Sequence, residues 1–355
     1  MFVKKRILYM DALRVIACLA VIFNHSGGFY LFGEQVPGGM MYRLDLIMSI
    51  CCKFAVPVFF AISGAMLLNR EIGLRALYTR RVFRMAVTLV VFSVGSYLVN
   101  VAQGRTAFSA KEMIFSLYDS DLNFSYWYLY AYLGFLMISP LLGAMLRSLD
   151  DRKILYMLAL GMFFGFVLPA IETLRWQGAH ALNPNFDMSF AACEAVLYPT
   201  MGYFVHHRLT TKKARQWLPL ALLAAAVAVG LCAEVTLREY YRTWVPKVEP
   251  YTALAMPFLG LAVMMGAKAI WGERLAESRL EGAISYAAAL SFGAYLVHIP
   301  VLHSDAMVTA FGAFCEVSAL PVMLEYLLQV LLTALVSGAI AAVLRKIPGF
   351  RWMLG

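Results

Sequence analysis

ILYMDALRVIACLAVIFNHSGGF, residues 7–29, is a nearly uninterrupted apolar run close to the start of the chain. A bilayer core of ~30 Å takes ~20 mostly apolar residues as a helix, so this run is long enough to cross a membrane. Nine further runs of similar character follow, at 44–68, 84–102, 126–146, 154–172, 188–206, 217–235, 251–270, 284–303 and 320–344. The sequence therefore predicts an all-α integral membrane protein, a bundle of about ten transmembrane helices.

The composition agrees with this prediction. Of the 355 residues 62% are hydrophobic and 14% are charged, and the mean hydropathy is +0.72. Soluble proteins carry ~25% charged residues, so this chain has too little charge to cover the surface of a soluble fold. The chain has no long polar stretch, which predicts a single transmembrane domain over residues 1–355 with no appended soluble domain. Its six cysteines form no CxxC pair, and we expect small core residues and no metal site.

The distribution of cations predicts the orientation. If both termini are cytoplasmic, the inner segments carry 21 Lys and Arg residues and the outer segments carry seven. Cytoplasmic loops of membrane proteins are enriched in Lys and Arg, so we expect both termini in the cytoplasm. The same rule accounts for the net charge of +9 without a nucleic acid partner.

Two ionisable residues of the first run share one face of the predicted helix. Arg14 and His25 are eleven residues apart, which places them within ~20° of each other and ~16 Å apart along the axis. Arg14 lies nearer the cytoplasm and His25 nearer the outside. Ionisable groups inside a membrane are costly, so both are candidates for function. The structural alternative is an ion pair between Arg14 and Asp11, three residues earlier, together with a histidine hydrogen-bonded to a neighbouring helix.

Other charges within the runs are weaker candidates. Lys53 in the second run could bind a ligand or extend its amine to the inner surface. Glu194 lies about a third of the way along the sixth run and is the strongest of the acidic candidates. Glu234 and Glu325 lie near the outer ends of their runs, and we expect both to reach water.

The ninth run contains a serine and a histidine at helical spacing. Ser291 and His298 are seven residues apart and therefore share a helix face. A histidine that only hydrogen-bonds a neighbouring helix is the alternative here. Trp127 lies at the start of the fourth run, where an aromatic residue either anchors the helix at the membrane interface or stacks on a sugar.

The first inner loop is rich in arginine. Arg81 and Arg84 form an RxxR pattern at the start of the third run, with Arg80 adjacent. Planar guanidinium groups bind phosphates with two hydrogen bonds, so these residues can hold an anionic cytosolic ligand. The alternative is charge that only sets topology.

Five segments resemble those of the integral membrane acyltransferase family 3, in the order of that family. They are DALRVIACLAVIFNH (11–25) with its R-x10-H spacing, VPVFFAISGAMLL (56–68), RRVFR (80–84), WYLYAYLGFLMISPLL (127–142) and SFGAYLVHIPVL (291–302). Each match alone is weak, but five in order are specific. The short form of the family is similar to bacterial surface-glycan O-acetyltransferases, including those acting on enterobacterial common antigen. Tyr126 stands before Trp127 where many relatives have a histidine, so we assign no proton-transfer role to that position.

The resemblance implies an enzyme of the bacterial inner membrane. It would move an acyl group, usually acetyl, from cytosolic acyl-CoA to a hydroxyl of a surface glycan or a lipid-linked saccharide. Membrane lipids would surround the enzyme. Arg80, Arg81, Arg84 and Lys53 would then bind the acyl-CoA, and no metal is expected. His25 would take the proton from the acceptor hydroxyl, because a neutral imidazole can accept one near neutral pH. Arg14 would orient the CoA. The competing interpretation is a multispan transporter or flippase for a polar glycan-related substrate, in which the buried charges line a substrate path.

Overall fold

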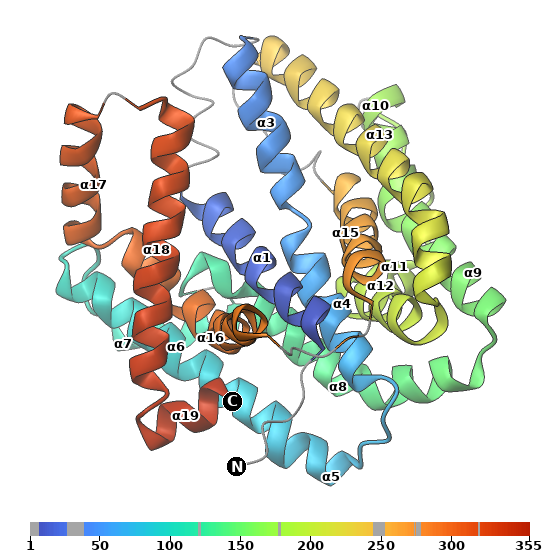
Figure 1. Ribbon diagram of the computed structural model, residues 1–355, viewed down its shortest axis with the longest axis horizontal. Helices are drawn as coiled ribbons and strands as arrows, with labels where there is room; N and C mark the ends of the chain where they lie inside the picture. Colours follow the sequence, from blue (N-terminus) through green and yellow to red (C-terminus); the bar gives the residue numbers. More distant parts are fainter. Residues whose placement is uncertain are drawn as a thin grey trace. The chain divides into compact units, whose positions relative to one another are not determined.

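The computed structural model describes residues 7–26, 39–119, 122–176, 179–243, 253–272, 274, 278–318 and 320–355. These residues are mostly helical and contain no β-strand, which confirms the prediction of an all-α integral membrane protein (Figure 1). Eight helical segments are long and apolar enough to cross a membrane: Leu8–His25, Tyr42–Leu67, Leu74–Ala102, Ala110–Ser148, Asp151–Trp176, Thr211–Arg238, Arg279–Leu302 and Met323–Leu344.

These eight segments coincide with eight of the ten predicted spans. The predicted span at 251–270 is a shorter apolar helix, α15 (Ala255–Trp271), of 17 residues. The predicted span at 188–206 is not one helix. It is divided into α11 (Ser189–Ala192) and α12 (Glu194–Tyr203) by the extended backbone of Cys193, and a π-helix, η4 (Phe204–Arg208), follows. The cytoplasmic placement of both termini stays a prediction.

The chain divides into two compact units, each built from two separate stretches of sequence. Unit 1 comprises Met1–Glu71 and Leu141–Ser285, and unit 2 comprises Ile72–Pro140 and Tyr286–Gly355. Whether the two units act as the single predicted domain stays a prediction.

Unit 1 is built around α4. Besides α11, α12, η4 and α15 it contains α1 (Leu8–His25), α3 (Met40–Cys52), α4 (Ala55–Leu67), α9 (Asp151–Met162), the π-helix η3 (Phe163–Val167), α10 (Leu168–Trp176) and α13 (Thr211–Thr243). The helix α4 packs against α12, α1 and α15, and α13 packs along α15. Nine of the thirteen residues of α4 are buried, so this helix forms the centre of the unit.

Glycines allow α4 and α12 to pack with their backbones in contact. A Cβ atom on Gly64 would overlap the backbone of Pro199, and a Cβ atom on Gly202 would overlap the backbone of Ala61. The two contacts run in opposite directions along the chain, so the helices are antiparallel. Small residues serve this purpose in membrane proteins, where close van der Waals packing replaces the hydrophobic effect between helices.

Gly202→Ala should therefore destabilise the protein strongly. The added methyl group has no room against the Ala61 backbone, and overpacking of this kind costs typically ~1–3 kcal/mol. The matched control is Gly230→Ala on α13, where a Cβ atom would meet nothing within 4 Å. Thermal unfolding in detergent should show a lower Tm for the first variant only. Equal Tm values for the two variants would contradict this packing.

The second predicted span, expected as one helix, is broken at Lys53. Helix α3 ends at Cys52 and α4 begins at Ala55. Pro57 accounts for the break, because it has no N–H to bond the Lys53 carbonyl four residues earlier and its ring would crowd that carbonyl. The break lies near the middle of the apolar segment Tyr42–Leu67. The backbone of Lys53 therefore lies well inside the membrane.

Unit 2 contains α5 (Leu74–Leu77), the π-helix η1 (Tyr78–Val82), α6 (Phe83–Ala102), α7 (Ala110–Asp119), the 3-10 helix η2 (Phe124–Tyr126), α17 (Asp305–Val317), α18 (Val322–Leu344) and α19 (Pro348–Leu354). It also holds most of α8 (Trp127–Ser148) and of α16 (Arg279–Leu302). The short helix α19 packs on α6, where the rings of Phe92 and Phe350 meet edge to face with centroids 5.9 Å apart. Arg345 donates from Nη1 to the Ala289 carbonyl (2.9 Å), which joins the end of α18 to α16.

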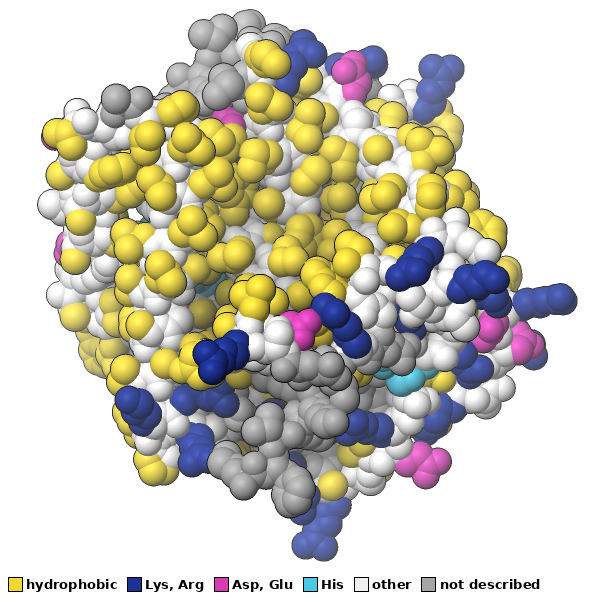
Figure 2. All heavy atoms as spheres, in the orientation of Figure 1, with side chains coloured by type: hydrophobic (Ala, Val, Ile, Leu, Met, Phe, Trp, Pro, Cys, Tyr) yellow, Lys and Arg dark blue, Asp and Glu magenta, His cyan; other side chains and the backbone are white. Residues whose placement is uncertain are grey.

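The surface of α13 is apolar along most of the helix and carries cations in its first turns. Exposed apolar side chains cover it, among them Trp217, Leu220, Leu223 and Val227. Its first turns carry Lys212, Lys213 and Arg215. Figure 2 shows this apolar covering over α13, with Lys and Arg side chains gathered toward the end where the helix begins. The exposed apolar side chains are stable in contact with lipid chains. The Lys and Arg side chains are stable in contact with water or lipid headgroups.

Candidate functional site

Arg14 and His25 lie on one unbroken helix, α1, as the sequence predicts. Their separation of eleven residues therefore corresponds to ~16 Å along the helix axis. Arg14 donates from Nη1 to Asp11 Oδ1 at 2.8 Å, which is the ion pair expected from the structural alternative. The Asp11 side chain is 1% exposed and that of Arg14 is 27% exposed, so the pair holds a buried carboxylate against a guanidinium that still reaches the surface of unit 1.

His25 is the last residue of α1. The next residue, Ser26, ends the helix: its backbone N–H bonds the Ile22 carbonyl (2.9 Å) and its hydroxyl donates to the Phe23 carbonyl (3.1 Å). These bonds fix the backbone directly beside the imidazole, which is half-buried. The helix therefore holds His25 in a defined position at the end opposite to Asp11.

Helix α3 carries an acidic residue that the sequence analysis missed. Asp45 is 2% exposed and Ser49 is 1% exposed. Together with Lys53 they follow one another at intervals of four residues, so all three share one face at the α3 end of the broken span. Helix α3 packs on α1. Asp45 lies inside the predicted span 44–68, so the rule that selected Arg14, an ionisable residue inside an apolar run, would also have selected Asp45.

A polar network joins the start of α1 to η4 and α15. The Tyr9 hydroxyl hydrogen-bonds His206 Nδ1 at 2.7 Å. Lys268, which is 1% exposed, donates to the carbonyl oxygens of Val205 (3.1 Å) and His206 (2.6 Å). His207 Nε2 donates to the Ala65 carbonyl at 2.7 Å. Lys268 therefore satisfies backbone carbonyls inside unit 1.

The three arginines of the RxxR pattern lie in unit 2. Arg80 and Arg81 are on the π-helix η1, and Arg84 is in the first turn of α6. A π-helix is rare and occurs frequently at functional sites. Arg80 is exposed, whereas Arg81 and Arg84 are half-buried. Arg14 belongs to unit 1, so the predicted donor-binding residues are divided between the two units.

Ser291 and His298 are buried on one continuous helix, α16, as predicted. The Ser291 hydroxyl donates to the Ala288 carbonyl at 2.9 Å. His298 is 0% exposed, and its Nδ1 lies 2.5 Å from the Tyr295 carbonyl, so this ring nitrogen must carry the proton. The rings of Tyr295 and His298 stack with centroids 5.6 Å apart. His298 is thus anchored on its own helix.

Tyr126 binds a carbonyl that a proline leaves without its helical partner. Pro300 lies inside α16 and has no N–H to bond the carbonyl of Leu296, four residues earlier. The hydroxyl of Tyr126 donates to this carbonyl instead, and Tyr126 is 1% exposed. A buried carbonyl without a partner is costly, so the tyrosine stabilises the helix at this proline.

The turn before α8 completes this connection. Asn123 Oδ1 accepts from the backbone N–H (3.1 Å) and the hydroxyl (2.8 Å) of Ser125, and Asn123 Nδ2 donates to Ser96 Oγ on α6 at 3.1 Å. The Tyr295 hydroxyl donates to the Ser125 carbonyl. Two of the family-like segments, WYLY and SFGAYLVH, therefore meet in unit 2. Trp127 itself is 39% exposed, as expected of an interfacial aromatic residue.

The acidic candidates differ in their surroundings. Glu194 begins α12 and is half-buried, at a helix start where unpaired N–H groups favour a negative charge. Glu234 is exposed and pairs with Arg238 at 2.7 Å, as expected for a residue that reaches water. The expectation for Glu325 is wrong: it is 8% exposed, whereas the neighbouring Leu324 is 46% exposed, so Glu325 lies on the covered face of α18.

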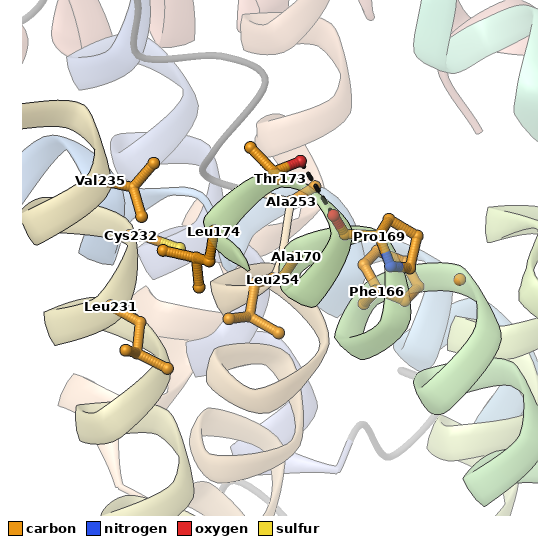
Figure 3. A pocket seen from close by; sticks show the side chains of 11 residues that line it. Phe166, Pro169, Ala170, Thr173, Leu174, Leu231, Cys232, Val235, Ala253 and Leu254 are labelled. Carbon is orange, nitrogen blue, oxygen red and sulfur yellow. Dashed lines mark hydrogen bonds between the residues drawn. The ribbon is translucent and has the colours of Figure 1, made fainter. Parts of the chain in front are cut away.

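Unit 1 also contains a small apolar cavity, which Figure 3 shows between α10, α13 and the residues just before α15. Leu174, Cys232 and Leu254 are among the residues that line it. Its volume is about 70 Å³, whereas small-molecule sites measure ~300–1,000 Å³. This cavity is too small for a substrate.

A helical membrane bundle with ionisable side chains inside its spans is typical of membrane enzymes and transporters. The sequence model of acyltransferase family 3, described as an acyltransferase domain, matches residues 7–344. The chain belongs to this family and is a multi-pass membrane acyltransferase. No curated protein and no solved structure matches the chain.

Proposed function

We propose that this acyltransferase moves an acetyl group from cytosolic acetyl-CoA to a hydroxyl of a surface glycan, in the cytoplasmic membrane of a bacterium. The observation that carries the proposal is the arrangement on α1. Its single helix holds a guanidinium in one half and an imidazole at the other end, ~16 Å away. Donor and acceptor can therefore approach from opposite faces of the membrane.

The chemistry assigns a separate task to each residue. His25 accepts the proton of the acceptor hydroxyl while the hydroxyl oxygen attacks the thioester carbonyl carbon. The C–S bond then breaks, the ester remains on the acceptor, and the proton passes to the CoA sulfur. Arg14 is too far along the helix to share this transfer and orients the CoA arm. Arg80, Arg81 and Arg84 neutralise the CoA phosphates. Lys53, which lies deeper in the membrane, is the further residue that we propose to bind the acyl-CoA.

The test uses purified protein in nanodiscs with acetyl-CoA labelled on the acetyl group. Surface glycan from a strain lacking this protein is the acceptor, because its hydroxyls would be unmodified. Labelled, alkali-releasable acetyl on the glycan supports the proposal. A second measurement places the same protein in sealed proteoliposomes, where uptake of glycan with no ester formed would identify a transporter and would overturn the proposal.

Arg81→Ala should raise the KM for acetyl-CoA with little change in kcat. A charge-assisted hydrogen bond contributes ~1.5–3 kcal/mol, which corresponds to an increase of about 10–150-fold in KM. Arg81→Lys should recover only part of the loss, since an ammonium group cannot form the paired bonds of a guanidinium. The control is Arg75→Ala, an exposed arginine of α5 in the same loop. If both alanine variants bind acetyl-CoA equally well, Arg81 serves topology only.

A further inference from the structure

Unit 2 contains a large groove that the proposed chemistry does not use. Its volume is about 860 Å³, and it is formed by α6, α16, α17 and α18, with Phe350 of α19 at one end. Figure 1 shows these helices, with α17 beside α18. Almost every lining side chain is aliphatic or aromatic. Its volume lies within the ~300–1,000 Å³ of small-molecule sites, and its lining suits a hydrophobic ligand.

The length of the groove corresponds to one hydrocarbon chain. On α6 the lining extends from Val91 to Gln103, and on α18 it extends from Leu332 to Leu344. Each stretch rises by ~18 Å at 1.5 Å per residue. One leaflet of a bilayer with a core of ~30 Å is ~15 Å deep. A single lipid chain therefore fits lengthwise between these helices.

The groove is polar at the end where α6 finishes. Gln103 and Ser304 line that end. The Oε1 atom of Gln103 is buried and has no hydrogen-bond partner among the described residues, whereas the Ser304 hydroxyl donates to the Val301 carbonyl at 2.8 Å. An amide oxygen can only accept, so it requires a donor such as a hydroxyl group. Close by, Arg105 pairs with Asp305 at 3.0 Å.

The polar end is the wrong one for acyl-CoA. Gln103 follows the end of α6, and Arg84 lies in its first turn, so the two are ~28 Å apart along the helix axis. The CoA phosphates are assigned to the arginine end. A headgroup at Gln103 therefore belongs to another molecule, on the opposite side of the membrane.

We propose that this groove binds the hydrocarbon chain of a lipid-anchored acceptor, with a hydroxyl-bearing headgroup at Gln103. The inference rests on the proposed function and makes its acceptor more specific: a saccharide that is still attached to a membrane lipid. Ser96 and Tyr126 also line the groove, so the bound chain lies against the network that joins the two family-like segments of unit 2.

The test is photolabelling in nanodiscs with an alkyl glycoside that carries a diazirine in its chain. In Gly95→Leu the new side chain enters the groove, because Gly95 lines it and a Cβ atom there meets nothing within 4 Å. Gly134→Leu on α8 is the matched control, since its Cβ atom also meets nothing within 4 Å and Gly134 does not line the groove. We expect labelling of α6, α16 and α18 to fall at least ~10-fold in the first variant only.

Gln103→Leu tests the headgroup. It should weaken labelling by the glycoside and leave unchanged labelling by an alkyl probe of equal chain length without hydroxyls. A diazirine phospholipid that labels the groove as strongly as the glycoside, or labelling that Gly95→Leu does not reduce, would overturn the inference. Labelling needs no turnover, so it can succeed even if acetyl transfer fails. If Gly95→Leu transfers acetyl to a lipid-linked glycan as fast as the wild type, the role given to the groove is wrong, and the proposed acetyl transfer still holds.

Discussion

His25→Ala is expected to lower acyl transfer by ~10²–10⁴-fold and to leave acetyl-CoA binding nearly unchanged. The imidazole is the general base in the proposed reaction, and without it the acceptor hydroxyl must lose its proton to water. His25 lies at the end of α1 opposite to Asp11 and Arg14, so its loss should not disturb the donor. Initial rates with labelled acetyl-CoA, together with equilibrium binding of CoA, separate the two effects.

The control for this variant is His180→Ala, because His180 is an exposed histidine of unit 1. It should keep wild-type turnover. A thermal unfolding curve for each variant shows whether α1 is still packed. Turnover close to that of the wild type in His25→Ala, with the protein folded, would remove His25 from the mechanism.

The second large effect concerns sidedness. In oriented proteoliposomes, acetyl-CoA supplied only at the cytoplasmic face should acetylate an acceptor sealed on the other face, and acetyl-CoA supplied only at the outer face should give almost no product. The predicted inner segments carry 21 Lys and Arg residues against seven in the outer segments. A polyanionic donor is therefore attracted to one face only.

Detergent-permeabilised proteoliposomes provide the control, since both substrates then reach both faces and sidedness should vanish. Vesicles without protein correct for leakage. If product forms only when donor and acceptor share one face, the acyl group does not cross the membrane through this protein, and the separate tasks given to Arg14 and His25 are wrong.

The sequence predicted most of the spans because hydropathy over ~20 residues measures the bilayer itself. It also placed Arg14 and His25 on one face, since a continuous helix fixes that relation. What it missed depends on single residues within a span. Pro57 indicates the break at Lys53, yet a window of average hydropathy passes over it.

The site in unit 2 was less predictable because it depends on contacts between distant segments. Ser291 and His298 were selected from one helix, whereas Asn123, Ser125 and Tyr126 come from a turn about 170 residues earlier, the separation of the bond from Tyr126 to Leu296. Only Pro300 gave a signal, because a proline inside a helix leaves a carbonyl that another group must bind. Which group binds it is decided by tertiary packing.

The break between α3 and α4 has a consequence for the biogenesis of the protein. A Lys at the centre of a span opposes insertion by ~2.5–3.5 kcal/mol, and each Leu, Ile, Phe or Val favours it by ~0.3–0.6 kcal/mol. The α3 half offers Leu44, Leu46, Ile47 and Ile50, which together supply only ~1–2.5 kcal/mol. It is also only 13 residues long, or ~20 Å, too short to cross alone. The translocon must therefore release α3 and α4 into the lipid as one piece, and a nascent chain that stops within α3 should remain outside the bilayer.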